Sequence, residues 1–170
     1  CGVETRYEFY DVEGANLEQL SAALRQKGPR DEDGKGRFAY TDWSVKWGWR
    51  KAGELGVDLN SVKLECKATI LLPRLKPATT LSADSIHAWH AFVERTREHE
   101  LSHLRHVELG APRIIRALAD EQRGSGVLTS ARANQIAKGI VAEIREMDRH
   151  YDARTDHGRL EGTWSLQPVG

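Results

Sequence analysis

The chain has 170 residues, and its 25 lysines and arginines balance its 25 aspartates and glutamates, so the formal net charge at pH 7 is zero. No basic block stands out, which argues against a nucleic-acid partner, because phosphate binding needs a clustered positive surface. No apolar run reaches the roughly 20 residues of a membrane-spanning helix. A chain of this length can bury roughly 70% of its extended surface, and we expect one domain over residues 1–170.

The first half of the sequence predicts strands. Apolar and polar residues alternate around Tyr7 and Phe9 and in two later segments, as in strands with one buried face. Gly28-Pro29 ends a short amphipathic helix, and a polar loop over residues 30–36 follows. The predicted elements are a strand over residues 4–14, a helix from Leu17 to Leu24, and antiparallel strands from Phe38 to Trp49 and from Val62 to Leu72.

The second half predicts helices over about 82–109, 112–122 and 130–151. Ser82 offers an N-cap to the first of them, and Gly110 with Pro112 supplies its stop signal. For the tail over 161–170 we expect a further strand through Trp164 and Leu166.

Together these elements predict an α+β fold. An N-terminal antiparallel sheet with a short helix, over about 4–75, would pack against a helical half over about 82–151. A loop and tail over 152–170 would follow.

Residues 99–103 (His-Glu-Leu-Ser-His) carry the strongest chemical signal, the pattern H-E-x-x-H. Residues four apart share one face of a helix, so His99 and His103 can direct their imidazoles at one point. Two neutral imidazoles beside an unligated carboxylate are typical of a zinc site, one ion per chain, in which Glu100 is the general base. Trp89 and Phe92 begin an apolar stripe that leads to these histidines. The simpler alternative is an amphipathic helix that carries surface histidines.

Such a site needs a third ligand, and several residues compete for that role. His106 lies on nearly the same face as His99 but about 10 Å further along the helix axis, so one ion would strain to reach it. His106 and Leu109 also stand where the metzincin pattern needs a glycine and a histidine, so that pattern fails. A gluzincin-like site would instead use a glutamate on a later helix: Glu121, Glu143 or Glu146.

His157 is the better candidate for the third ligand. It follows the last predicted helix, which ends near Tyr151, and Gly158 leaves the backbone free to turn back toward a neighbouring helix. Asp152 and Asp156 could orient the ligand imidazoles, or could themselves be oxygen ligands. The hydroxyl of Tyr151 could donate a hydrogen bond to an oxyanion. The alternative is a capping loop with ordinary turn residues.

Several stretches, taken in order, carry a likeness to a known family. They are Thr5-Arg6-Tyr7, Tyr10 to Gly14, Gly28-Pro29, Ala39 to Trp47, Leu71-Leu72-Pro73, the H-E-x-x-H residues, and Tyr151-Asp152 with Thr155 and His157-Gly158. With them the chain resembles DUF922, bacterial proteins of uncharacterised function that are predicted to be secreted zinc-dependent proteases. The resemblance runs from about residue 5 to residue 158. It implies that His157 is the third ligand and that the protein is exported.

Cys1 is followed by Gly2, as in a bacterial lipoprotein whose signal peptide has been removed and whose cysteine carries the lipid. An arbitrary start of the chain is the alternative. Cys66 is the only other cysteine, so a Cys1–Cys66 disulfide is a third prediction, which lipidation of the thiol would exclude. We expect the protein in the periplasm, the cell envelope or the medium, without a membrane span and with Cys1 as a candidate lipid anchor.

Trp43, Trp47 and Trp49 lie in one predicted strand and allow two interpretations. Exposed, they would line a cleft for an extended peptide that adds a strand to a sheet edge. Buried, they would pack the sheet on the zinc helix, which is the interpretation that we favour.

The sequence therefore predicts an exported zinc metallopeptidase that acts on peptides or proteins. Zn²⁺ would be held by His99, His103 and His157, with Glu100 as the general base and Tyr151 as the candidate for stabilising the oxyanion. This hypothesis depends on three imidazoles converging on one ion. The alternatives are a non-enzymatic envelope protein that binds zinc, and a zinc hydrolase of a non-peptide amide such as cell-wall material.

Overall fold

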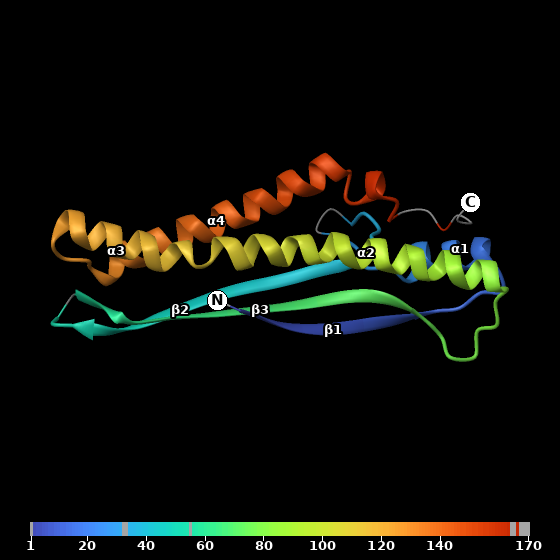
Figure 1. The fold of residues 1–170 in the computed structure, drawn as a ribbon, viewed down its shortest axis with the longest axis horizontal. Coiled ribbons are helices and arrows are strands. Elements are labelled where there is room, and N and C mark those ends of the chain that lie inside the picture. The colour runs from blue at the N-terminus through green and yellow to red at the C-terminus, as the bar shows by residue number, and fades with distance from the viewer. Residues whose placement is uncertain (1, 32–33, 55, 164–165, 167–170) are drawn as a thin grey trace. The chain divides into compact units, whose positions relative to one another are not determined.

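The computed structural model describes residues 2–31, 34–54, 56–163 and 166. These residues form a three-stranded sheet, four α-helices and one short 3-10 helix (Figure 1). The predicted α+β class is confirmed, with the sheet and one short helix preceding a helical half. In chain order the elements are β1 (Val3–Val12), α1 (Leu17–Lys27), β2 (Tyr40–Ala52), β3 (Gly56–Leu75), α2 (Ala83–Gly110), α3 (Arg113–Ser125), α4 (Ser130–Thr155) and η1 (Arg159–Glu161).

β3 is the central strand of the sheet, whose order is β1-β3-β2. Only three residues separate Ala52 from Gly56, and a connection this short joins antiparallel neighbours, so β2 and β3 form a hairpin. Gly53 in that turn has a φ of +67°, a conformation that glycine adopts without a steric penalty.

The residues group into two compact units by their internal contacts. The first unit draws on the N-terminal residues up to Glu4, on Trp43–Ala68 and on Leu104–His150. The second draws on Thr5–Asp42, on Thr69–His103 and on the residues from Tyr151 onward. Because each unit is assembled from three stretches of chain, no single position in the sequence divides them.

The core of the second unit lies around the N-terminal part of α2. Trp89 and Phe92 form a buried cluster with Leu20 and Leu24 of α1 and with Val12 of β1. The ring centroids of Trp89 and Phe92 are 5.7 Å apart. This cluster is the start of the apolar stripe that the sequence predicts along α2.

In the first unit, β2 meets α4 through its tryptophans. The indole N–H groups of Trp43, Trp47 and Trp49 donate hydrogen bonds to Asp148, Asn134 and Ser130 of α4, at 2.6, 2.9 and 3.3 Å respectively. Side chains at alternate positions of a strand point to one face, so a single face of β2 supplies all three contacts. This arrangement favours packing over an exposed cleft, and the helix that receives the indoles is α4.

Some predictions fall outside the described residues. Cys1 is one of them, so its lipidation and its pairing with Cys66 stay predictions, while Cys66 itself is buried on β3. The strand predicted for the tail depends on Trp164, which is also outside the described part, while Leu166 packs against the core of the second unit. Within the described residues, every helix is too short or too polar to cross a membrane.

Candidate metal centre

The H-E-x-x-H residues lie within the continuous helix α2, on its buried face. His99, Glu100 and His103 are only 6%, 6% and 8% exposed. They follow Phe92 and Thr96 along the same apolar stripe, since helical positions three and four apart share a face. The two imidazole rings meet nearly edge to face, with centroids 5.2 Å apart and an angle of 84° between their planes. The prediction that the core packing of α2 reaches these histidines is confirmed.

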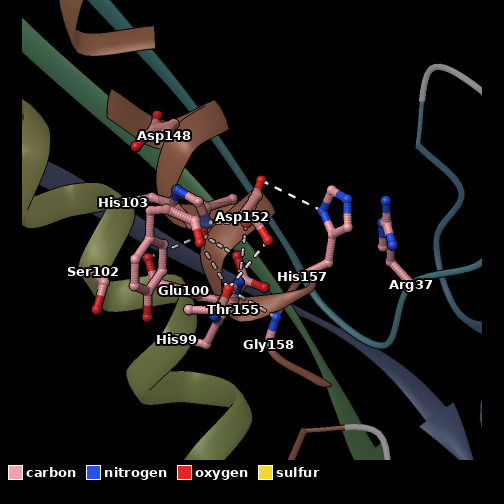
Figure 2. Close-up of polar contacts among 12 residues, drawn as sticks. Arg37, His99, Glu100, Ser102, His103, Asp148, Asp152, Thr155, His157 and Gly158 are labelled. Atoms are coloured by element: carbon pink, nitrogen blue, oxygen red, sulfur yellow. Dashed lines mark hydrogen bonds and ion pairs between the residues drawn. The ribbon is translucent and has the colours of Figure 1, made fainter. Parts of the chain in front are cut away.

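Asp152, in the last turn of α4, lies against both imidazoles (Figure 2). Its Oδ1 is 3.3 Å from Nε2 of His99 and 3.3 Å from Nε2 of His103. These three side chains can each offer one ligand atom, and the three atoms lie within 4.8 Å of one another. The structure therefore brings the two predicted histidines together with a residue that the sequence offered only as an orienting group or an oxygen ligand.

The two separations from Asp152 Oδ1 fit a zinc ion. Ligands about 2.0–2.1 Å from a tetrahedral zinc lie roughly 3.3–3.4 Å from each other. The observed separations from Asp152 Oδ1 to the two Nε2 atoms, each 3.3 Å, match that tetrahedral edge. A carboxylate oxygen and two imidazole nitrogens are also ligands that zinc accepts readily. The donor set therefore fits the metal that the sequence predicts.

His157 lies beside this group and is not a member of it. Its Nδ1 is 3.7 Å from Asp152 Oδ2, whereas Oδ1 is the oxygen beside the two Nε2 atoms, and its side chain is 39% exposed (Figure 2). The reason is local. α4 continues to Thr155 instead of ending near Tyr151, which leaves Asp152 on the helix. His157 then falls in a left-handed turn, with φ angles of 50° at Asp156 and 52° at His157.

Glu100 receives a hydrogen bond from a residue that is distant in sequence but belongs to the same unit. The hydroxyl of Thr41, at the start of β2, donates to Glu100 Oε2 at 2.7 Å. Burial raises the pKa of Glu100, and its neighbours His103 and Thr41 offset only part of that effect. A general base works best with a pKa near the working pH, so a raised value suits the predicted role.

Glu161 is a neighbour of the candidate metal group that sequence reasoning missed. Its Oε2 lies 2.7 Å from Nδ1 of His99, the ring nitrogen opposite the one that faces Asp152. The hydroxyl of Tyr151 donates to the same carboxylate, at 3.0 and 3.2 Å to its two oxygens. Asp156, a predicted orienting group, pairs instead with Arg159. Nothing in the spacing of Glu161 signals its role, because only the turn after α4 brings it back.

The histidines and carboxylates of this group shift the pKa values of one another. Burial alone would lower the pKa of the His99 imidazole, but contacts with Asp152 and Glu161 outweigh burial and raise it. Burial alone would raise the pKa of Asp152, yet its contacts with His103 and His99 hold that pKa well below the usual range. Without a metal, a charged carboxylate thus faces a ring that favours its protonated form. A cation could take the place of that proton.

The remaining ligand candidates have other contacts. His106 Nδ1 lies 2.7 Å from Asp148 Oδ1, within the first unit. The three glutamates considered for a gluzincin-like site all pair with arginines: Glu121 with Arg132, Glu143 with Arg113 and Glu146 with Arg149.

The fold and this site define a mixed α+β protein with a candidate metal centre on an H-E-x-x-H helix. The chain belongs to DUF922, a family of bacterial proteins of unknown function, whose model matches residues 7–158. The match spans the H-E-x-x-H helix and Asp152, and it ends before Glu161. Neither the curated proteins nor the solved structures include a match to this chain.

Proposed function

We propose that this protein is a zinc-dependent hydrolase that cleaves peptide bonds. The supporting observation is the group of His99, His103 and Asp152, in which Asp152 Oδ1 lies 3.3 Å from each Nε2 atom, beside the buried carboxylate of Glu100. Since the third imidazole of the sequence hypothesis stands outside this group, the proposal now rests on Asp152 as the third ligand. A tetrahedral site with three protein ligands keeps its fourth position open for water or substrate, as catalytic zinc sites do.

The roles of the protein's own groups follow from their positions. Glu100 would accept the proton of the attacking water and pass it to the leaving nitrogen. Thr41 would fix the orientation of that carboxylate through its 2.7 Å hydrogen bond. A bound zinc ion would lower the pKa of water and polarise the substrate carbonyl. Tyr151 donates a hydrogen bond from its hydroxyl to Glu161, so we give it a supporting role in place of the predicted contact with an oxyanion.

Peptide bonds are proposed as the substrate because two histidines and an unligated glutamate in this spacing are typical of metallopeptidases. Action on a non-peptide amide and zinc binding without catalysis remain the alternatives that an experiment must separate. The place of action, outside the cytoplasm, stays a prediction from the family resemblance.

The Glu100→Gln variant tests the proposal. We expect it to keep its zinc content, because no ligand changes, and to hydrolyse a peptide library at least about 100-fold more slowly, the lower end of what a general base contributes. Metal analysis and library profiling, each with and without a chelator, measure the two effects. Glu98→Gln is the matched control, because Glu98 lies on the same helix and pairs with Arg97 at the surface.

Each alternative has its own outcome in this experiment. An unchanged rate in Glu100→Gln would remove Glu100 from the mechanism. If the original protein binds zinc and cleaves only cell-wall amides, the substrate class changes. If it binds zinc and cleaves neither substrate, the non-enzymatic alternative stands.

A further inference from the structure

We propose that Glu161 is a positioning residue that fixes the tautomer and the ring orientation of His99 for metal binding. The inference rests on the proposed metal site and concerns a residue three positions beyond the stretch that the family model matches. Three features support it: the contact with His99, the contacts of Tyr151 with both Glu161 and His99, and the turn that carries Glu161.

The contact with His99 is short and uses the correct ring nitrogen. Glu161 Oε2 lies 2.7 Å from Nδ1, while Nε2 on the other side of the ring lies 3.3 Å from Asp152 Oδ1. A neutral imidazole carries one proton, so a carboxylate that binds Nδ1–H leaves the lone pair on Nε2. That lone pair is the one directed at the candidate metal position. An outer carboxylate on a ligand histidine also makes the ring more basic toward the metal.

Tyr151 holds both partners of this contact. Its hydroxyl donates to Glu161 Oε1 at 3.0 Å and to Oε2 at 3.2 Å. Its ring stacks on the His99 imidazole, with centroids 5.0 Å apart and 24° between the planes. Rotation of either the carboxylate or the imidazole would therefore break a contact with Tyr151. The stacking fixes the ring plane, and the hydrogen bonds fix the carboxylate.

The turn that carries Glu161 is built for a close approach to His99. Gly158 has a φ of +81°, and a Cβ added there would lie 2.5 Å from Thr163 Oγ1 and 3.2 Å from His99 Nδ1. The Gly158 amide donates to Thr155 Oγ1 at 3.1 Å, which ties the turn to the end of α4. The Glu161 amide donates to the Gly158 carbonyl at 2.9 Å. Only a glycine at position 158 permits this path.

A second attachment lies on α2 itself. Arg95 Nε donates to the carbonyl of Gly162 at 3.2 Å, one turn of helix before His99. The segment after α4 is thus anchored on both helices that supply the ligands, directly before and after Glu161. An anchored backbone limits how far the carboxylate can move from Nδ1.

The affinity for Zn²⁺ of the full chain tests this role. We expect Glu161→Ala to bind Zn²⁺ about 10–100-fold more weakly in competition with a chromogenic chelator, the range typical for loss of an orienting partner. Glu161→Gln should lose less, because its amide oxygen still accepts from Nδ1–H. Glu94→Gln is the matched control, because it also removes one negative charge, at a position on α2 where Glu94 pairs with Arg97. Its affinity for Zn²⁺ should equal that of the original chain.

Nitrogen NMR of the His99 ring supplies a measurement that needs neither turnover nor metal. In the metal-free protein, at a pH where the ring is neutral, we expect the proton on Nδ1 in the original chain and a mixture of tautomers in Glu161→Ala. Circular dichroism establishes that each variant is folded, and Glu161→Leu, which keeps more of the side-chain volume but has no acceptor for Nδ1–H, serves if the alanine variant is not.

The outcomes separate this inference from the proposed function. Zinc binding without hydrolysis would overturn the proposed hydrolase function, but the Zn²⁺ affinities of the Glu161 variants would still test the inference. Equal zinc affinities in the original chain and in a folded Glu161→Ala or Glu161→Leu variant would overturn the inference, as would an unchanged tautomer in the NMR spectrum of that variant. Tighter Zn²⁺ binding by Glu161→Ala would also overturn the inference. It would mean that Glu161 only stabilises the protonated His99 ring, and a protonated ring competes with the metal.

Discussion

Asp152 owes its place in the site to one additional turn of helix. α4 continues to Thr155, so the Asp152 carboxylate projects from a rigid element toward α2, with Oδ1 3.3 Å from both ligand nitrogens. His157 follows in a left-handed turn, where non-glycine residues lose about 1–2 kcal/mol of conformational free energy each. A side chain on a helix is placed more accurately than one on a loop, which suits Asp152 as the ligand.

Alanine substitutions at these two positions separate the two candidate ligands. We expect Asp152→Ala to lose zinc affinity by more than about 100-fold, the upper limit for losing an orienting partner, because a direct ligand disappears. His157→Ala should lose much less, since its Nδ1 reaches only Asp152 Oδ2, at 3.7 Å. Competition with a chelator gives both values. If His157→Ala is the more damaging of the two, His157 is the ligand as the sequence predicted.

At the scale of elements, β2 and α4 are joined by three indole hydrogen bonds with different acceptors. Asp148, the acceptor for Trp43, also contacts Nδ1 of His106 at 2.7 Å, so one carboxylate ties a strand and two helices within the first unit. The acceptor for Trp47 is the neutral amide of Asn134. Hydrogen bonds to charged groups contribute more to stability than those between neutral groups.

Two substitutions in the same strand measure that difference. We expect Trp43→Phe to lower the free energy of unfolding by about 1.5–3 kcal/mol, because a half-buried carboxylate loses a donor. Trp47→Phe, with a neutral acceptor, should lower it by only about 0.5–1.5 kcal/mol. Denaturant unfolding of the two variants provides the comparison. Equal losses would show that ring volume, and not the charged acceptor, determines the contribution of Trp43.

At the scale of the whole molecule, the balance of charges leaves no net field to oppose folding at neutral pH. Stability at high pH depends instead on particular buried groups. Tyr10 is one, because burial raises the pKa of its hydroxyl far above the usual value. That hydroxyl donates to the Phe38 carbonyl at 2.7 Å, a contact that ionisation would remove.

This raised pKa predicts alkaline unfolding. Below about pH 10, Tyr10 is neutral in both states and its contribution to stability is complete. Above that pH the unfolded chain ionises and the folded chain does not, so the free energy of unfolding falls by up to about 1.4 kcal/mol per pH unit from this group. We expect Tyr10→Phe to be less stable at pH 7 and to lose stability less steeply above pH 10. Denaturant midpoints across pH 7–11 test this, and parallel slopes would exclude Tyr10 as the cause.

The sequence by itself determined the features that depend on neighbours along the chain. Strand alternation and helical periodicity are local, so the α+β class, the limits of α2 and the burial of His99 and His103 could be predicted. The spacing of residues 99–103 likewise put His99 and His103 on one side of the helix, because positions four apart on a helix must share a face. The end of α4 was one local feature missed, by four residues, and it moved the candidate third ligand from His157 to Asp152.

Only the tertiary structure decided which distant groups complete the site. Thr41 meets Glu100 across 59 positions of sequence, and Glu161 meets His99 across 62. No periodicity links residues so far apart. Their contacts exist because the start of β2, the middle of α2 and the turn after α4 fold into one unit. In the sequence, a glutamate in a turn has no feature that distinguishes it from other surface glutamates; only the folded turn places it beside His99.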